Sequence, residues 1–278
     1  MTWNEIEPEP LPRLGVIGGL RMVVRVIFFA IITLVLVIIW ALAMALEKLT
    51  GGQRLSGAVV RLWARAGHLM AGLRLELTGE EMKHGGAIVA NHSTWCDIFV
   101  LHSAAHIHFV SKAEVAAWPV IGWLARVTGT LFIERRQTAA KRQQAQLAER
   151  ISGGDKLCFF PEATSSDGLR VLPFNSTLFG VFHTKELREL VWVQPVTVTY
   201  FPPRGRSRRF YGWWGDMDFG PHALMILGLS VGGRVRVSFH PPLKAADYPT
   251  RKALALAAGE VVRAGLQRSL GDGYGESA

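Results

Sequence analysis

A histidine and an aspartate five positions apart, His92 and Asp97, follow the short apolar run 87–90. Acyl transfer to an alcohol needs a base beside the hydroxyl, and a neutral imidazole suits that task near pH 7. A carboxylate bonded to the other ring nitrogen would fix the tautomer and stabilise the imidazolium. On a regular helix, five positions separate two side chains by about 140°, so the pair meets only if His92 lies in the turn before a helix holding Asp97. Taken alone, the pair is better explained by a capping or core histidine and a helix-start aspartate.

Two further segments place polar side chains after apolar ones. Residues 159–166 read Phe-Phe-Pro-Glu-Ala-Thr-Ser-Ser, which leaves one carboxylate and three hydroxyls after an apolar run. Residues 129–136 read Gly-Thr-Leu-Phe-Ile-Glu-Arg-Arg, and arginine is the natural fork for a phosphate or carboxylate. Open α/β sheets commonly bind ligands at the carboxyl ends of their strands. We therefore expect the His/Asp, Arg and Glu/Thr groups to form one polar site at a sheet edge.

From residue 73 onward, short apolar runs alternate with helical stretches. The strands are expected at 73–77, 87–90, 108–110, 130–133, 157–160, 191–199 and 235–239. The helices are expected at 97–105, 120–127, 139–151 and 251–270, the last ending before Gly271. This alternation predicts an α/β domain over residues 72–278, built on a mixed, largely parallel sheet flanked by helices.

The N-terminal part differs in character. Residues 1–20 carry glutamates and prolines, which predicts a flexible tail. Residues 26–46 carry no charge and are long enough to cross a hydrocarbon core of about 30 Å. Residues 53–72 are amphipathic at a helical period, which fits a helix at a membrane interface or one packed on the domain. We expect membrane-anchoring helices over 21–71.

The alternatives for the apolar stretch are a signal peptide and a buried core helix. The stretch exceeds a signal-peptide core in length, and no clear cleavage site follows it. Arginines and lysines lie on both sides of it, so charge barely decides its orientation. A helix that enters and leaves one leaflet remains open.

Composition favours a membrane partner over a nucleic acid. The chain has 31 Lys and Arg against 22 Asp and Glu, a formal charge of +9, and a mean hydropathy of +0.21. A basic surplus attracts nucleic acid or an anionic bilayer. No nucleic-acid recognition motif accompanies the charge, and the uncharged stretch points to lipid. The two cysteines, Cys96 and Cys158, form no disulfide or zinc pattern, which suggests a reducing compartment and no metal site.

These segments together resemble the glycerolipid acyltransferases of the lysophosphatidic acid (1-acylglycerol-3-phosphate) O-acyltransferase type, or their lyso-ornithine lipid branch. The resemblance covers roughly residues 70–240, and four family blocks occur in the family's order. They are Asn91-His92 to Asp97 (H-x4-D), Gly129 to Arg135 with Phe132-Ile133 (G-x-x-F-I-x-R), Phe160-Pro161-Glu162-Ala163-Thr164 (F-P-E-G-T) and Val193-Gln194-Pro195-Val196 (V-x-P-V).

The resemblance implies a role for each matched residue. His92 would take the proton of the acceptor hydroxyl with Asp97 as its support, and no acyl-enzyme would form. The positions expected to bind the acceptor are Arg135, Glu162, Thr164 and Lys112. Those expected to shape the site are Asn91, Gly129, Phe132, Pro161 and Pro195.

The resemblance also implies the partners. They are a lysolipid acceptor, acyl-CoA or acyl carrier protein as donor, and an anionic membrane surface; no cofactor is expected. The catalytic domain would sit on the cytoplasmic face of the inner or plasma membrane. The expected acceptor is lysophosphatidic acid, giving phosphatidic acid in phospholipid biosynthesis, with a lyso-aminolipid such as lyso-ornithine lipid as the alternative.

Two positions depart from the family pattern. Ala163 stands where the family usually has Gly, which is tolerable at negative φ and costly at positive φ. Ser165 stands where many members have Arg, which weakens the case for a phosphate-bearing acceptor and fits the lyso-ornithine branch. Arg136 or Arg170 could compensate.

Other function classes fit less well. Residues 228–232 match G-x-S-x-G, but a strand is expected after the serine and the later acid and histidine come in the wrong order for a hydrolase. His102, His106 and His108 lack the carboxylates or thiolates of a metal site. A non-catalytic lipid-binding membrane protein is the remaining alternative of another class.

Overall fold

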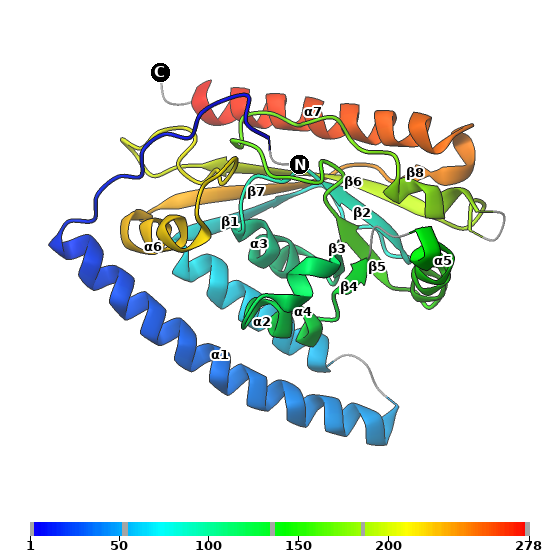
Figure 1. The fold of residues 1–278 in the computed structure, drawn as a ribbon, viewed down its shortest axis with the longest axis horizontal. Coiled ribbons are helices and arrows are strands. Elements are labelled where there is room, and N and C mark those ends of the chain that lie inside the picture. Colours follow the sequence, from blue (N-terminus) through cyan, green and yellow to red (C-terminus); the bar gives the residue numbers. More distant parts are fainter. Residues whose placement is uncertain (1–2, 52–54, 134–136, 185–186, 276–278) are drawn as a thin grey trace.

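The computed structural model of the protein describes residues 3–51, 55–133, 137–184 and 187–275. Within these ranges one sheet of eight strands forms the centre of the α/β domain (Figure 1). The strands are β1 (Leu73–Thr78), β2 (Gly86–Ala90), β3 (His108–Lys112), β4 (Leu131–Ile133), β5 (Lys156–Phe159), β6 (Trp192–Phe201), β7 (Gly233–Phe239) and β8 (Leu243–Lys244).

The sheet is mixed and largely parallel, as predicted. Its order is β1-β7-β6-β2-β5-β3-β4, and β8 pairs with β6. Only β6–β7 and β6–β8 pair in antiparallel fashion among the described strands. Each of the seven predicted strands occurs, with ends shifted by a residue or two, whereas β8 was not predicted.

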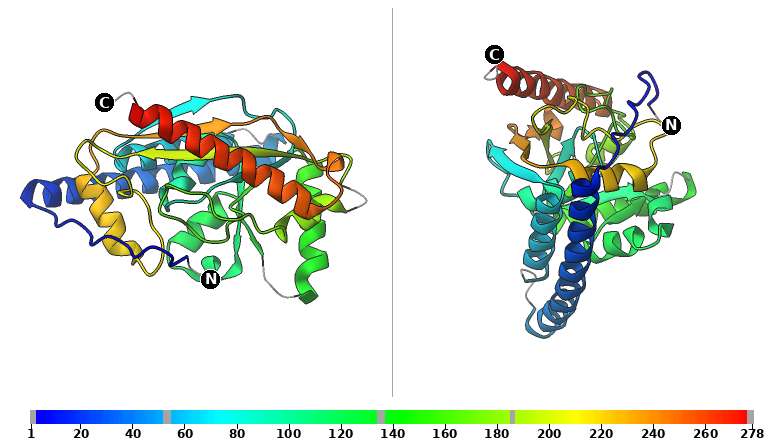
Figure 2. Two further views of the ribbon diagram at one scale, coloured as in Figure 1. Left: turned by 90° about the horizontal axis from the view of Figure 1, so that it is seen from above. Right: turned by 90° about the vertical axis from the view of Figure 1, so that its left-hand side faces the viewer.

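Helices cover both faces of the sheet (Figures 1 and 2). The α-helices are α1 (Val16–Thr50), α2 (Leu55–Met70), α3 (Cys96–Ala104), α4 (Ile121–Val127), α5 (Gln137–Ser152), α6 (Phe219–Leu229) and α7 (Arg251–Gly275). The 3₁₀ segments are η1 (Ala113–Ala117), η2 (Leu178–His183) and η3 (Ala245–Asp247). The helix α7 lies on one face, while α3, α2 and α1 lie on the other.

Two helices differ from the prediction. The helix α7 does not stop before Gly271 but runs to Gly275. The helix α6 was not predicted, because Phe219–Leu229 is apolar on nearly every side and contains Gly220 and Pro221, so it shows little helical period.

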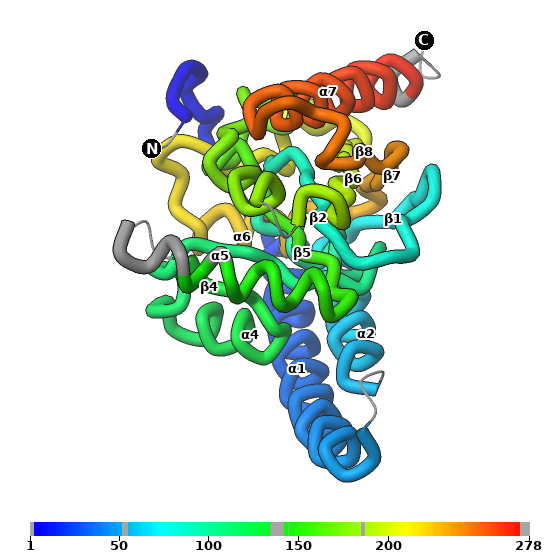
Figure 3. Tube along the Cα trace, turned by 90° about the vertical axis from the view of Figure 1, so that its right-hand side faces the viewer, coloured from blue at the N-terminus to red at the C-terminus, as the bar shows by residue number. Residues whose placement is uncertain are grey.

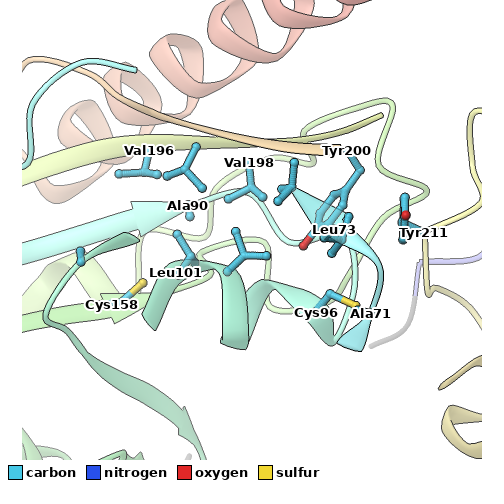
Figure 4. Packing of buried hydrophobic residues seen from close by; sticks show 14 of the residues in the cluster. Ala71, Leu73, Ala90, Cys96, Leu101, Cys158, Val196, Val198, Tyr200 and Tyr211 are labelled. Atoms are coloured by element: carbon cyan, nitrogen blue, oxygen red, sulfur yellow. The ribbon is translucent and has the colours of Figure 1, made fainter. Parts of the chain in front are cut away.

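The core divides into one layer on each face of the sheet. Beneath the sheet, side chains of β2, β6 and β7 meet α3, where Leu101 and Cys96 are fully or almost fully buried (Figure 4). Above it, Val89 and Phe159 meet Leu254 of α7. Every residue of β2 is buried, as expected for a central parallel strand covered on both faces.

The helix α1 is fastened to the domain along one stripe and exposes apolar side chains elsewhere. Arg21 Nη1 donates to the backbone oxygen of Gly228 at 2.8 Å, and Arg25 Nη1 donates to those of Leu227 and Ser230, each at 2.9 Å. These carbonyls belong to the C-terminal end of α6 and its cap, where unpaired acceptors and the negative end of the helix dipole favour cations. Both arginines are therefore part of the joint between α1 and α6.

Among the described helices, α1 alone is long and apolar enough to cross a membrane. With 35 residues it is about 52 Å long at 1.5 Å per residue. Its C-terminal half and the facing part of α2 project beyond the α/β layers (Figures 2 and 3).

The helix α2 packs on α1 with one side and leaves large apolar side chains exposed elsewhere. Trp63 and Ala64 are buried against α1, and Trp63 Nε1 donates to Thr33 Oγ1 at 3.1 Å. The carboxylate of Glu47 accepts the backbone N–H groups of Leu55 and Ser56, at 2.6 and 2.9 Å, and so satisfies two donors at the start of α2. Other α2 side chains remain exposed, namely Leu55, Leu62 and Leu69.

Residues 3–15 lie against the loop after β6. Trp214 Nε1 donates to the backbone oxygen of Ile6 at 2.8 Å, and Trp3 is buried with its ring centroid 6.4 Å from that of Trp214. Part of the segment predicted as a flexible tail thus has defined contacts. The following helix begins at Val16, whereas the boundary was predicted at residue 21.

Candidate active site

The turn between β2 and α3 brings His92 and Asp97 together. β2 ends at Ala90 and α3 begins at Cys96, so His92 lies before the helix that holds Asp97. His92 Nδ1 lies 2.7 Å from Asp97 Oδ2. The contact that the sequence required is confirmed, in the arrangement that five-residue spacing demands.

Asp97 is completely buried and bonded on both carboxylate oxygens. Oδ2 also accepts the backbone N–H groups of Ser93 and Thr94, at 2.8 and 3.1 Å. Oδ1 accepts the hydroxyl of Tyr200 at 2.6 Å. These donors compensate for burying a charge and orient the carboxylate toward the imidazole. Figure 4 shows Tyr200 on β6 with its hydroxyl turned toward the start of α3.

The imidazole of His92 is held on several sides. Its ring stacks on Phe160 with centroids 4.1 Å apart and an interplanar angle of 13°. Its backbone N–H donates to Glu162 Oε1 at 2.7 Å, and its backbone oxygen accepts the N–H of Ser166 at 2.9 Å. The side chain keeps 19% of its surface exposed. With Nδ1 occupied by Asp97, Nε2 is the ring nitrogen left for a reacting group.

Asn91 joins the end of β2 to β6. Its side-chain amide donates to the backbone oxygen of Val198 at 2.9 Å, and its side-chain oxygen accepts the N–H of the same residue at 2.8 Å. Pro195 lies opposite Val89 in the β2–β6 register. These contacts fix the strand end from which the His92 turn starts.

The Gly129 segment lies farther away, on the edge strand of the sheet. β3 and β5 separate β4, which holds Phe132, from β2. Gly129 has φ of +76°, and a Cβ there would come within 2.5 Å of the ring of His108, so glycine is needed. Arg135 and Arg136 lie outside the described residues.

Glu162, expected to bind the acceptor, is turned into the protein. Its Oε1 accepts the N–H of His92, and its Oε2 accepts the N–H of Leu172, both at 2.7 Å. Burial raises the pKa of this carboxyl to about 8, against the opposing effect of the two backbone donors. The side chain ties the His92 turn to the loop that follows Pro161, which is itself buried.

Ala163 adopts a left-handed backbone conformation, with φ of +59°. This is the costly case for a residue that replaces a glycine, and a Cβ in this region costs about 1–2 kcal/mol. Its backbone oxygen accepts a hydrogen bond from Lys112 Nζ at 3.0 Å. Lys112, at the end of β3, therefore contacts the loop that carries Thr164, which is partly exposed.

The residues after Thr164 bond mostly to protein. Ser165 Oγ donates to the backbone oxygen of Trp213. Asp167 is completely buried between two arginines, with Arg170 Nε 3.1 Å from Oδ1 and Arg209 Nε 3.0 Å from Oδ2. Ser165 thus holds the loop beside His92 to the loop after β6.

Two sequence features do not contribute to this site. The Gly228–Gly232 motif has a helix before Ser230 and a strand after it, the reverse of a hydrolase nucleophile turn. No group of three histidines, cysteines or acidic residues suited to a metal occurs in the described ranges. The chemistry available is that of an imidazole with a carboxylate partner.

Tyr200 and Phe160 were not predicted as part of the site. Tyr200 lies in the apolar run of β6, and only the placement of β6 beside β2 brings it to Asp97. Phe160 was recognised only as part of its sequence block. An aromatic residue following the strand next to β2 was the available signal.

Comparisons with known proteins find acyltransferases among the relatives of this chain. Residues 74–199 match the Acyltransferase family model. The chain is 45% identical over 270 residues to a lyso-ornithine lipid O-acyltransferase of Rhodobacter capsulatus, covering 96% of this chain and 98% of the relative. A 1-acyl-sn-glycerol-3-phosphate acyltransferase of Neisseria gonorrhoeae is 36% identical over 110 residues, or 39% of this chain and 43% of that protein.

The fold is shared with a solved structure. The 1-acyl-sn-glycerophosphate (LPA) acyltransferase PlsC from Thermotoga maritima superposes with a TM-score of 0.62 at 20% identity, covering 90% of this chain and 97% of that one. At this identity the likeness concerns the fold alone. On the family model and the full-length relative, the chain belongs to the acyltransferase family.

Proposed function

We propose that the protein transfers a fatty acyl group from a thioester to the hydroxyl of a lyso-ornithine lipid, with His92 as general base and Asp97 as its partner. The choice of lyso-ornithine lipid as acceptor rests on the similarity to a lyso-ornithine lipid O-acyltransferase, which extends over nearly the whole of both chains. The similarity to the lysophosphatidic acid enzyme spans only 39% of this chain. The alternative acceptor expected from the sequence is therefore favoured over lysophosphatidic acid.

The reaction follows from the position of the imidazole. His92 Nε2 takes the proton of the acceptor hydroxyl while the oxygen attacks the thioester carbonyl. Asp97 keeps the other proton on Nδ1 and stabilises the imidazolium. When the tetrahedral intermediate collapses, the C–S bond breaks, and the imidazolium returns its proton to the leaving thiolate of CoA or acyl carrier protein. An ester and a free thiol result.

The loop after Thr164 supports an acceptor without a phosphate. A phosphate group calls for arginine forks. Ser165 replaces an arginine of the family pattern, and its hydroxyl bonds to Trp213. Arg170 already pairs with buried Asp167. An ornithine head group, which carries an amine and a carboxylate, demands less positive charge than a phosphate does.

We also propose that α1 holds the enzyme on the membrane, with the active site on the cytoplasmic side where thioester donors are made. The exposed apolar face of α1 supports this part of the proposal. Attachment of the full-length chain is measured by flotation with phospholipid vesicles. Recovery of the protein in the bottom fraction would count against it.

An assay of purified full-length protein tests the acceptor. The protein is given acyl-CoA with lyso-ornithine lipid or lysophosphatidic acid at equal concentration in the same detergent. We expect kcat/KM to be at least about tenfold higher for lyso-ornithine lipid, which corresponds to a difference in activation free energy of about 1.4 kcal/mol. An equal or greater value for lysophosphatidic acid would overturn the choice of acceptor.

A pair of histidine variants tests the base. His92→Ala should lower turnover with either acceptor by at least about 100-fold, because the proton acceptor is lost. His84→Ala, which alters an exposed histidine after β1, should keep the rate of the parent protein. Activity retained by His92→Ala would discard the base assignment.

A further inference from the structure

The turn between η1 and α4 presents three large apolar side chains to solvent. Trp118, Val120 and Trp123 are 43%, 69% and 45% exposed. Single exposed apolar residues are common on soluble surfaces, but a cluster of large ones marks an interaction site. The cluster lies within six consecutive residues, in a segment that contributes no predicted site residue.

The turn holds these side chains outward at a conformational cost. Val120 has φ of +61° and ψ of −54°, a region that β-branched residues rarely enter. The N–H of Ile121 donates to the oxygen of Pro119 at 2.6 Å, which closes a γ-turn around Val120. Glycine would adopt this positive φ without steric strain, so a turn that only reverses the chain favours glycine at this position. The large side chain at the tip therefore points to a surface that it meets.

The helix α4 itself packs on the two N-terminal helices. Leu124 contacts the cluster formed by Leu36 of α1 and Trp63 of α2. A small apolar groove continues from there past Trp40. Figure 3 shows α4, α1 and α2 side by side below the sheet. The turn thus borders the apolar surface of α1 that we propose to lie in lipid.

Tryptophan at two positions favours a bilayer interface as the occupant. Among the described contacts, neither indole N–H of Trp118 or Trp123 has a protein acceptor. At the head-group level of a bilayer, the ring meets acyl chains while the N–H meets water and ester oxygens. The charge of +9 adds attraction to anionic lipids.

We propose that Trp118, Val120 and Trp123 insert into the head-group region of the bilayer that holds α1, as a second lipid contact. The inference rests on the membrane anchoring under Proposed function. A domain held by a single helix can still rotate about the axis of that helix. A second lipid contact on a different element restricts this rotation and the tilt of the domain. The turn would therefore set which face of the domain meets the bilayer.

Site-directed labelling separates this inference from the anchoring itself. The full-length variants Trp123→Cys, Leu42→Cys and Leu256→Cys are each labelled with an environment-sensitive fluorophore. Native Cys96 and Cys158 are buried, and burial raises the pKa of both thiols, so the introduced cysteine reacts selectively. Labelled protein is bound to phosphatidylglycerol–phosphatidylcholine vesicles that carry doxyl lipids as quenchers.

We expect probes at 42 and 123 to lose on the order of half their emission, and the probe at 256, exposed on α7, to keep its emission. Quenching at 42 without quenching at 123 would refute the second contact and leave anchoring intact. Absence of quenching at both would refute the anchoring as well. A blue shift at 123 that grows with protein concentration and resists lipid quenchers would assign the turn to a second copy of the chain.

A double substitution provides an independent measurement. Trp118→Ala with Trp123→Ala should lower the partition coefficient into the same vesicles by about tenfold. Leu256→Ala, the matched loss of an exposed apolar side chain elsewhere, should leave partitioning unchanged. Partitioning of the double variant equal to that of the parent protein would overturn the proposal, provided that its melting temperature is preserved.

Discussion

The hydroxyl of Tyr200 donates a hydrogen bond to Asp97 Oδ1 over 2.6 Å, although the two residues are 103 positions apart in the chain. Asp97 Oδ2 meanwhile faces His92 Nδ1. One carboxylate thus links a strand of the core to the imidazole at the end of another. Tyr200 is buried, and burial together with the nearby Asp97 charge raises the pKa of its phenol, which keeps it a hydrogen-bond donor.

Tyr200→Phe should lower kcat by about tenfold, because a hydrogen bond to a charged group stabilises by about 1.5–3 kcal/mol. The loss would arise because Asp97 keeps its bonds to Ser93 and Thr94 but loses the donor that orients Oδ1. Tyr211→Phe is the matched control: this buried phenol bonds to Ser230 instead of Asp97. A fall in kcat of the same size for Tyr211→Phe would assign Tyr200 a packing role alone.

Asp97→Asn should reduce kcat by at least about 100-fold, because the charge that stabilises the imidazolium is lost. The fold should survive, since the amide oxygen can accept from Ser93 and Thr94 while its nitrogen donates to the hydroxyl of Tyr200. Circular dichroism checks the fold, and turnover with acyl-CoA checks the loss. A rate within about twofold of that of the parent protein would contradict the role of Asp97 as the partner of His92.

Glu162→Gln should change how stability depends on pH. The folded protein holds the Glu162 proton up to about pH 8, whereas the unfolded chain releases it near 4.5. The native state therefore binds more protons in this window, and stability falls as pH rises through it. The melting temperature of the variant minus that of the parent should increase from pH 5 to pH 8. A constant difference would show that this carboxyl is already ionised when buried.

Ala163→Gly should raise stability by up to about 1 kcal/mol, because glycine accepts the positive φ without the Cβ clash. The contact between Lys112 and the backbone oxygen at 163 should persist, so activity should remain. Ala257→Gly, in the regular helix α7, should instead destabilise by about 1 kcal/mol. Thermal denaturation in detergent compares the two; a lower melting temperature for Ala163→Gly would contradict the strain.

The strands were predictable because buried parallel strands are continuous apolar runs, as in β2. The meeting of His92 with Asp97 was predictable because it needs only a local turn. The bond from Tyr200 depends on β6 lying beside β2, which no local pattern reports. The inward orientation of Glu162 was hidden for a similar reason, because its partners are backbone N–H groups, one of them on His92, 70 positions earlier in the chain.

The N-terminal helices showed another limit of sequence patterns. Arg21 and Arg25 precede an uncharged stretch and look like the flank of a membrane span. In the structure they bind the carbonyl end of α6, a helix that the sequence pattern did not reveal. An interpretation based on flanking charge had no means of finding a partner two hundred residues away.

The joint between α1 and α6 couples the imidazole to the lipid in which α1 is proposed to lie. Phe219 at the start of α6 packs edge-on against Trp95, 5.8 Å between centroids, and Trp95 follows His92 by three residues. Contacts therefore run from α1 through α6 to the turn that carries His92. With α1 in lipid as proposed, a change in bilayer thickness that shifts α1 would be passed through α6 and Trp95 to the turn that positions His92 relative to the acceptor hydroxyl.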